Sequence, residues 1–342
     1  MMKVTIRQIA EQLHLSIAAV SRALDGYPDI SAETRQRVLE KAHEMGYVPN
    51  HAARQLRRQK TDAIGYILPA GTPGFQESFF SEFLIGLGNE APKHTLDLLV
   101  TTAGSDFAAE QNLYRNWVRS HKVDGFILNR VRLNDWRVRY LSENKIPFVG
   151  LEHSLDGIDY PCIEVDNVGG LAGLVAHVYQ NGFRRMAFIG GPPHLKIQAA
   201  RLTGYRQGLA DCELSFDPDL VVESDLSETS GYEAARRLRW LPNPPDALIC
   251  LNDEIAFGAL RAVRDLGLVV GRQVAVTGFD GVARALHSQP PLTTLDIPVF
   301  EIAQSLVQML AQQLTKPLPE PTRQSITPRL LVRASTRGGY RH

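Results

Sequence analysis

The sequence predicts an α/β protein with an all-α helix-turn-helix domain at its N-terminus and, behind it, two lobes of doubly wound parallel sheets. Two helix-start signals eleven residues apart, Thr5 to Gln8 and Ser16, predict the first part. Short apolar runs that alternate with amphipathic helical stretches over the remaining 282 residues predict the second part. Because one core rarely grows past about 250–300 residues, this length and repetition favour two lobes.

The first helix-start signal is a capping box, Thr5-Ile6-Arg7-Gln8. The threonine hydroxyl can accept a hydrogen bond from an otherwise unpaired backbone N–H, and the glutamine can reach back to the backbone of Thr5. Apolar residues then recur at helical spacing at Ile6, Ile9, Ala10 and Leu13. A helix is therefore expected from Ile6 onward.

The second signal is Ser16, which can cap a helix from Ile17 to Asp25. Val20 and Leu24 are expected to face the first helix. The outward face is short, polar and basic, and consists of Ala18, Ser21 and Arg22. Such a face suits a helix that reads bases in the major groove of DNA.

A third helix is expected from Ser31, with Gly46 as its stop. Its apolar stripe consists of Val38, Leu39 and Ala42. Tyr47 to Asn50 then ends the bundle, and Asn50 can cap a short helix from His51 to about Arg58. A helix of two turns is marginal in water, so this one should form fully only with DNA and a second copy of the chain. A generic three-helix bundle is the alternative interpretation of these caps and stripes.

The charge is divided along the chain. Lysine and arginine number 37 and so do aspartate and glutamate, but residues 1–60 hold ten of the basic and six of the acidic side chains. The net charge is therefore +4 for this stretch and −4 for the rest. A basic head on an acidic body fits phosphate contacts at one end only.

Nine apolar runs behind the head read as buried parallel strands. They are Ala63–Leu68, Thr95–Thr101, Val123–Leu128, Pro147–Leu151, Cys162–Val165, Met186–Ile189, Leu220–Val222, Ala247–Leu251 and Val274–Thr277.

Several stretches together resemble the lactose/galactose repressor (LacI/GalR) family, and the resemblance covers the whole chain. They are Thr5–Ala10, Leu15-Ser16, Ala19–Gly26, Ser31–Arg35, Gly46–Asn50 and Ala53–Leu56. In that family the second helix lies in the major groove, and a hinge helix pairs with its dimer mate in the minor groove. The resemblance implies that Leu56 is a wedge inserted at the central base step.

Carried over by position, Ile17, Ala18 and Arg22 would contact bases, with Arg22 suited to bridge guanine O6 and N7. Ser16, Ser21 and Asn50 would lie near phosphates or cap helices. The full predicted DNA-binding set is Thr5, Ser16, Ile17, Ala18, Ser21, Arg22, Asn50, Ala53 and Leu56. The chain departs from the family pattern at Ala19, at His51 and at His14, where the turn usually has a glycine and positive φ is expected.

The resemblance also implies that the lobes are periplasmic-binding-protein-like (type I) and interleaved. The expected domains are residues 1–46, a hinge and linker at 47–60, and an effector-binding and dimerisation domain at 61–340. The chain would cross between lobes near residues 162, 292 and 323. The N-lobe would comprise about 61–161 and 296–323, and the C-lobe about 162–292 and 324–340.

The cleft between the lobes is the natural place for a small molecule, because α/β proteins bind ligands at the carboxyl ends of strands and at domain interfaces. The candidate effector-binding residues are Phe79, Phe80, Asn129, Arg130, Glu152, Arg201, Asn252 and Asp280. Family motifs place effector contacts at Arg201, Asn252 and Asp280. The alternatives are that Phe79 belongs to the core and that Asp253 caps a helix. Asp166-Asn167 is expected to start a helix and is left out of the site.

Polar side chains in this set can donate to and accept from vicinal hydroxyls, and the two phenylalanines can lie against a sugar ring. The segment from Asn129 to Arg137 resembles family members that respond to oligosaccharides or glucosides, in which the first Arg reaches the sugar and the later Asp and Arg are structural. The expected effector is a mono- or oligosaccharide or a sugar phosphate, although Glu152 would disfavour a phosphate unless Arg130 or His153 offset it. A purine or another small metabolite that acts as a corepressor is the alternative.

No motif for catalysis, a cofactor or a metal is present, and Gly86-Leu87-Gly88 lies in a helical stretch rather than after a strand. An enzyme and a purely architectural DNA-binding protein are therefore the weaker interpretations. Cys162, Cys212 and Cys250 read as inert thiols of a reducing compartment. Without a signal peptide or an apolar run near 18 residues, the expectation is a cytoplasmic bacterial protein, nucleoid-associated when bound to DNA.

The expected mechanism is an allosteric switch. Two chains pair through their lobes and place two recognition helices on a pseudo-palindromic operator, with the hinge helices at its centre. A bound effector releases the DNA, with the opposite sign as the alternative. Because no leucine heptads follow Leu331, a dimer is expected rather than a tetramer.

Overall fold

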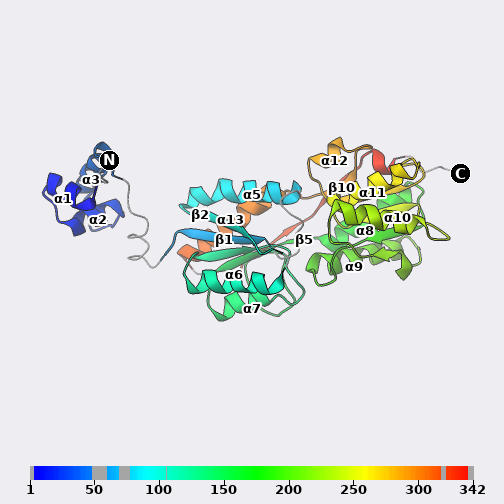
Figure 1. Ribbon diagram of the computed structural model, residues 1–342, viewed down its shortest axis with the longest axis horizontal. Coiled ribbons are helices and arrows are strands. Elements are labelled where there is room, and N and C mark those ends of the chain that lie inside the picture. Colours follow the sequence, from blue (N-terminus) through cyan, green and yellow to red (C-terminus); the bar gives the residue numbers. More distant parts are fainter. Residues whose placement is uncertain (1–3, 48–59, 69–77, 105, 317–320, 338–342) are drawn as a thin grey trace. The chain divides into compact units, whose positions relative to one another are not determined.

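The computed structural model describes residues 4–47, 60–68, 78–104, 106–316 and 321–337 (Figure 1). The chain divides into two compact units, Met1–Lys60 and Thr61–His342. Among the described residues, no helix combines the length and the apolar character that a membrane crossing needs.

The first unit is a bundle of α1 (Ile6–Leu13), α2 (Ile17–Leu24) and α3 (Ala32–Glu44). Its small core consists of Ile9, Ala10, Val20, Ala23, Val38 and Ala42. The capping box is confirmed, since the Gln8 backbone N donates to Thr5 Oγ1 and the Thr5 backbone N donates to Gln8 Oε1. His14 has φ 53°, as expected for a residue at the glycine position of the turn.

Three details of this bundle differ from expectation. Helix α2 ends at Leu24 rather than Asp25. Leu39 is exposed, so it does not belong to the apolar stripe of α3. Ser21 is buried, not outward-facing. At about 100° per residue, Ser21 lies only about 60° around the helix from Leu24, which places it at the border of the buried stripe.

The hinge positions Asn50, Ala53 and Leu56 lie outside the described residues, as does the rest of the expected hinge helix.

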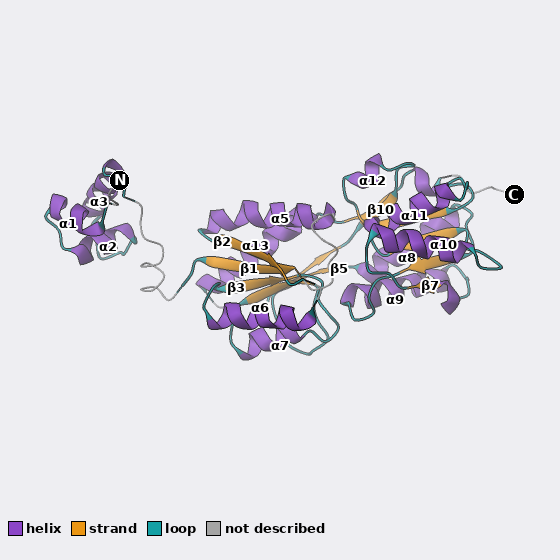
Figure 2. Ribbon diagram, in the orientation of Figure 1, coloured by secondary structure: helices purple, strands orange, loops and turns teal. Residues whose placement is uncertain are grey.

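The described residues of the second unit form two six-stranded sheets with helices on both faces (Figure 2). The first sheet has the order β11-β5-β4-β3-β1-β2, and the second has the order β12-β10-β9-β8-β6-β7. Every strand pair is parallel except β10 with β12. The strands of the first sheet are β1 (Ala63–Leu68), β2 (Asp97–Thr102), β3 (Gly125–Leu128), β4 (Phe148–Leu151), β5 (Cys162–Val165) and β11 (Arg323–Ile326). Those of the second are β6 (Met186–Ile189), β7 (Val221–Val222), β8 (Ala247–Cys250), β9 (Ala275–Asp280), β10 (Thr293–Asp296) and β12 (Arg329–Leu331).

The sheet topology moves each expected crossing between lobes a few residues later along the chain. Strand β5 pairs with β4, so the chain leaves the first sheet after Val165 and not near 162. Strand β10 pairs with β9, which keeps Thr293–Asp296 in the second sheet. Strand β11 returns to the first sheet through Ile326 before β12 enters the second.

Helices α5 (Ser78–Glu90) and α13 (Val299–Thr315) pack together on one face of the first sheet, and α6 (Phe107–Arg119) and α7 (Trp136–Glu143) cover the other (Figure 1). The helices of the second sheet are α8 (Asn167–Gln180), α9 (Lys196–Asp211), α10 (Glu228–Arg239), α11 (Asp253–Asp265) and α12 (Arg284–His287). Short 3₁₀ turns lie at Ala91–His94, Pro218–Leu220 and Ala334–Thr336.

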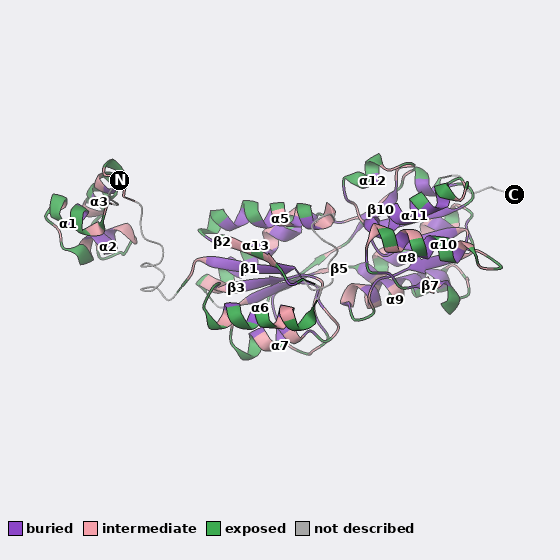
Figure 3. Cartoon of the chain, in the orientation of Figure 1, coloured by how far each residue is buried: buried purple, intermediate pink, exposed green. Residues whose placement is uncertain are grey.

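Strand β1 shows why the sheets read as continuous apolar runs. All six of its residues are buried, because helices cover both faces (Figure 3). Ile64 and Tyr66 belong to the core shared with α5 and α13, whereas Ala63 and Ile67 belong to the core under α6 and α7. Because both faces of the strand are buried, polar side chains are found at the carboxyl ends of the strands instead.

Candidate functional site

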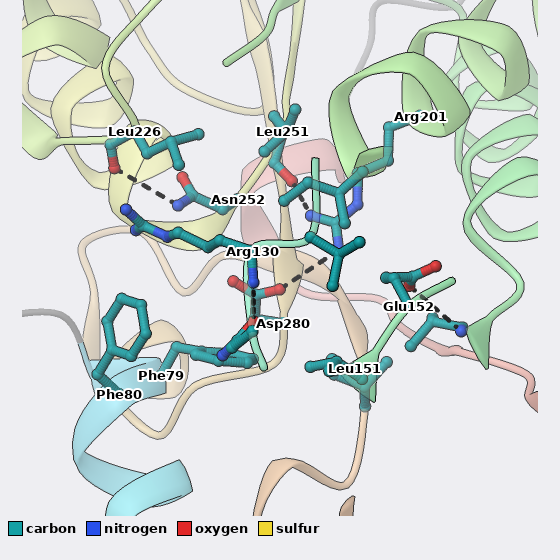
Figure 4. Close-up of a pocket in the computed structure, with 15 residues that line it drawn as sticks. Phe79, Phe80, Arg130, Leu151, Glu152, Arg201, Leu226, Leu251, Asn252 and Asp280 are labelled. Atoms are coloured by element: carbon teal, nitrogen blue, oxygen red, sulfur yellow. Dashed lines mark hydrogen bonds and ion pairs between the residues drawn. The ribbon is translucent and has the colours of Figure 1, made fainter. Parts of the chain in front are cut away.

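One pocket in the second unit is lined by residues from both sheets and collects all eight residues of the expected effector set (Figure 4). About 600 Å³ of space in it, open mouth included, is not filled by protein atoms. The lining comprises Phe79, Phe80, Asn129, Arg130, Val131, Leu151, Glu152, Val165, Ile197, Arg201, Leu226, Leu251, Asn252, Asp280 and Ile297. Seven of these fifteen residues end or directly follow a strand, so the parallel sheets bring them together: Asn129, Leu151, Glu152, Val165, Leu251, Asp280 and Ile297.

Arg201, on α9, is the buried cation of the pocket, with 4% of its surface exposed. Its Nε donates to Asn167 Oδ1 at 2.8 Å, and its Nη1 donates to the Leu251 carbonyl. Its Nη2 lies 3.6 Å from Asp280 Oδ1. Burial lowers the pKa of the guanidinium, while the nearby Asp280 carboxylate raises it. Arg201 is thus held in one orientation at the pocket wall.

Glu152 follows β4 in a left-handed backbone conformation, with φ 76°. Its Oε1 accepts from Asn167 Nδ2 at 2.8 Å and from the Val165 backbone N at 3.3 Å. Burial raises the pKa of this carboxyl to about 7. His153 is not part of the lining, because its Nε2 lies 3.2 Å from Arg323 Nη2 and its ring stacks on Tyr160.

Asn167 is a residue that sequence reasoning left out. Asp166 does cap α8, as expected, through the Gly169 backbone N. The next residue, Asn167, is 2% exposed and bridges Glu152 and Arg201 with its amide. The available signal was its place directly after the carboxyl end of β5, the same signal that pointed to Asn129 and Asn252.

Asn252 has two roles. Its Oδ1 accepts from the Ile255 backbone N at 2.9 Å, which caps α11, and its Nδ2 donates to the Leu226 carbonyl at 3.4 Å. Asp253 is neither the cap nor a lining residue. It is fully buried and accepts from Thr294 Oγ1 at 2.6 Å and from the Val282 backbone N at 2.9 Å.

Aromatic rings from the start of α5 form another wall. Phe79 and Phe80 are in edge contact, with centroids 5.6 Å apart, and the Arg130 guanidinium lies 4.8 Å from the Phe80 centroid. Arg130 has φ 48°, and its backbone N donates to Asn129 Oδ1. Phe79 also stacks on Phe83, so it packs against the core as well as lining the pocket.

The later acidic and basic residues of the segment after β3 are structural. Arg137 is fully buried, and its Nη2 donates to Asp135 Oδ2 at 2.6 Å. Arg132 makes two hydrogen bonds to the buried Glu110. These ion pairs hold the loop that presents Asn129 and Arg130.

A second candidate surface belongs to the first unit. Ser16 caps α2 through the Ala19 backbone N at 3.0 Å. Ile17 is 49% exposed although it is apolar, and Ala18 and Arg22 are also exposed. An exposed apolar residue beside a cation suits contact with thymine methyls and guanine edges. Thr5 is exposed at the start of α1.

No group of three or more His, Cys, Asp or Glu side chains that could hold a metal ion occurs in the part of the chain that the structure describes. The three cysteines are free, and Cys162 and Cys250 are buried.

Comparisons with known proteins give a consistent picture. Residues 5–50 match the family model for bacterial regulatory proteins of the lacI family, and residues 175–336 match that for a periplasmic binding protein-like domain. The HTH-type transcriptional regulator AglR of Rhizobium meliloti (strain 1021) is 34% identical over 98% of this chain and 95% of its own length. The HTH-type transcriptional repressor CytR of Escherichia coli (strain K12) is 29% identical over 97% and 96%.

Two solved structures are similar over nearly the whole chain. A transcriptional regulator CelR–cellobiose complex has a TM-score of 0.74 and 28% identity, covering 97% of this chain and 100% of its own. The lac repressor dimer bound to operator and the anti-inducer ONPF has a TM-score of 0.84 and 25% identity, covering 98% and 100%.

Proposed function

The chain belongs to the LacI family of bacterial transcriptional regulators, and from that premise we propose that it is a repressor released from its operator by an uncharged carbohydrate bound in the pocket. The family consists of DNA-binding regulators and not enzymes. The protein acts as a homodimer in the bacterial cytoplasm, on a pseudo-palindromic operator, through Ile17, Ala18 and Arg22.

The charged side chains of the pocket favour an uncharged effector. Arg201 already contacts Asp280, Asn167 and the Leu251 carbonyl, so it has little capacity left for a phosphate. Two carboxyl groups, Glu152 and Asp280, accompany the two arginines of the lining. A phosphate would lie near the Asp280 carboxylate in a desolvated site, where like charges repel strongly.

The remaining features support a sugar. Aspartate, asparagine and arginine side chains offer both donors and acceptors, which hydroxyl groups require. Phe79 is partly exposed at one side of the same space, whereas Phe80 is buried beside the Arg130 guanidinium. The similar CelR structure is a complex with cellobiose, which makes this disaccharide a reasonable first probe for the present chain.

The test is a melting experiment on the full-length protein with glucose, cellobiose, glucose 6-phosphate and adenosine. A ligand that binds only the folded state stabilises it by about 2.7 kcal/mol at a concentration a hundredfold above its dissociation constant. We expect the melting temperature to rise with an uncharged sugar and not with the phosphate. A rise with adenosine alone would favour a purine-type corepressor and would contradict the carbohydrate assignment.

Asp280→Asn provides the site-directed control. It keeps the shape of the side chain and removes the charge beside Arg201, so at least tenfold more sugar should be needed for the same rise. Asp211→Asn, at the exposed end of α9, should leave the response unchanged. An unaltered response in Asp280→Asn would show that the sugar binds elsewhere.

A further inference from the structure

The side chain that we assign to base reading, Arg22, is paired with an acid from the same unit. Arg22 Nη2 lies 2.7 Å from Asp29 Oδ2, and the guanidinium carbon lies 5.1 Å from the centroid of the Tyr27 ring. Both charged side chains are about half exposed, with 51% and 49% of their surface accessible. The pair therefore lies at the surface, beside the exposed Ile17 and Ala18 of the same helix.

The turn that carries Asp29 is fixed to the bundle. Arg35, on α3, donates through Nη2 to the Gly26 carbonyl at 3.3 Å and to the Tyr27 carbonyl at 2.7 Å. The Tyr27 backbone N donates to the Arg22 carbonyl at 3.0 Å. Ile30, next to Asp29, packs against the small core. The carboxylate is thus held next to the guanidinium by the fold and does not reach it through a mobile loop.

An acidic side chain on a DNA-facing surface is costly, because DNA carries a dense row of negative phosphates. An exposed ion pair contributes only about 0–1 kcal/mol to stability, so folding alone gives little reason for Asp29. A carboxylate here has two effects on binding. It restricts the conformations of Arg22. It also places one negative charge per chain near the phosphates of any duplex, which repel it.

We propose that Asp29 is a specificity-determining residue that positions Arg22 for guanine and weakens binding to DNA of any other sequence. This inference rests on the proposed base-reading role of Arg22. On the operator, the orientation that Asp29 imposes on Arg22 strengthens its two hydrogen bonds to guanine, which are worth about 1–3 kcal/mol, and this gain offsets the repulsion. On random DNA nothing offsets it. Discrimination gained by an added repulsive element is a general route to specificity.

The test compares two duplexes, an operator recovered by selection from random sequences and a scrambled duplex of the same length. Asp29→Asn keeps the shape of the side chain and removes the charge. Because each net phosphate contact contributes a salt slope of about −0.9, we expect affinity for the scrambled duplex to rise roughly tenfold at about 0.1 M salt. Affinity for the operator should change much less, so the ratio of the two affinities should fall about tenfold.

The Arg22→Ala variant tests base reading by Arg22 separately from the role of Asp29. If Arg22 reads guanine, Arg22→Ala alone lowers the affinity ratio, and an unchanged ratio would refute that role. With Arg22 absent, adding Asp29→Asn should raise the affinities for both duplexes by the same factor. If Asp29→Asn raises both equally while Arg22 is still present, the proposed role of Asp29 is wrong.

Glu40→Gln is the matched charge control. Glu40 is exposed on α3 and accepts from Gln36 at 2.9 Å, so its loss removes one negative charge from the same unit. We expect the affinity ratio to stay within about twofold of the wild-type value. A fall equal to that of Asp29→Asn would assign the effect to net charge rather than to the pair with Arg22. Unchanged melting temperatures would show that the variants fold.

Discussion

At the scale of single residues, the pocket depends on a short chain of hydrogen bonds that joins parts of both lobes. Glu152 follows a strand of the first sheet, Asn167 begins α8, and Arg201 lies on α9 over the second sheet. The Asn167 amide donates to Glu152 and accepts from Arg201. Buried polar side chains are tolerated when they are hydrogen-bonded in this way. A ligand that touches any of the three side chains therefore affects the contacts of both lobes.

Glu152 leads to a prediction about pH. Its pKa is raised by burial from 4.5 to about 7, so the folded state holds this proton more tightly than the unfolded state does. The stabilisation is fully present below pH 4.5 and is lost as the pH rises through about 7. Between pH 6 and pH 8 the loss is about 1 kcal/mol. Melting curves should show that Glu152→Gln removes this part of the pH dependence.

The measurement must be a difference between the variant and the wild type. His177 and His194 have pKa values lowered by burial, so they act in the opposite direction and mask the total. They are present in both proteins and cancel in the difference. For a domain of this size, about 1 kcal/mol corresponds to roughly 2–4 °C in melting temperature. Parallel curves of melting temperature against pH for the two proteins would refute a neutral, protonated Glu152.

Local signals between residues close in sequence could be predicted well. The Thr5 capping box and the left-handed His14 depend on neighbours within four residues, and both were found as expected. Ser21 lies at the border of the apolar stripe of α2, where spacing alone does not decide burial, and the burial of Asn167 depends on other elements. Asn167 reads as part of a helix start, and only the folded chain brings it against Glu152 and Arg201.

At the scale of elements, helix α5 lines the pocket with its first turn and packs closely against α13 at one of its glycines. Phe79 and Phe80 lie in its first turn and line the pocket. Further along, a Cβ on Gly86 would lie 2.6 Å from the Phe300 carbonyl oxygen and 2.7 Å from Ala303 Cβ, both on α13. The two helices thus approach each other closely at Gly86. Gly88, two residues on, has nothing within 4 Å of such a Cβ.

The two glycines should respond in opposite ways to alanine. Gly86→Ala forces α5 and α13 apart and should destabilise the protein by about 1–3 kcal/mol, the usual cost of overpacking. Gly88→Ala meets open space in a helix and should stabilise by about 0.5–1 kcal/mol, because it removes the entropic cost of glycine. Urea titration of both variants measures this. Equal effects of the two substitutions would show that α5 and α13 do not pack closely at Gly86.

The apolar pattern predicts most of the strands but neither the short or polar strands nor the pairing between strands. The nine expected apolar runs correspond to strands of the two sheets, whereas β10, β11 and β12 were not expected. Arg323–Ile326 is mostly polar and lies at the edge of its sheet, and β12 has only three residues, so neither forms an apolar run. The sheet to which β5 belongs is decided by pairing with β4 and with β11, which is more than 150 residues away in sequence. Because strands buried on both faces all read as near-continuous apolar runs, the pattern does not identify the partner of each strand.

At the scale of the whole molecule, the chain separates its two tasks into two units with separate cores. The residues assigned to DNA lie in residues 1–60, and every residue that lines the pocket lies in Thr61–His342. Net charges of +4 and −4 follow the same division, so the attraction to phosphate is confined to the head. A regulator built in this way must couple two binding events that share no residue.

That coupling must be equal in both directions, which gives the last prediction. If the sugar found in the melting screen weakens operator affinity of the full-length protein by a given factor, saturating operator must weaken sugar affinity by the same factor. Couplings of about 5–150-fold are typical and correspond to about 1–3 kcal/mol. We expect release, measured by operator titration with and without sugar and by sugar titration with and without operator. Asp280→Asn should shift the sugar concentration needed for release without changing operator affinity in its absence, since Asp280 lies in the other unit. If the sugar tightened operator binding, the protein would be a corepressor-dependent repressor and the proposed sign would be wrong.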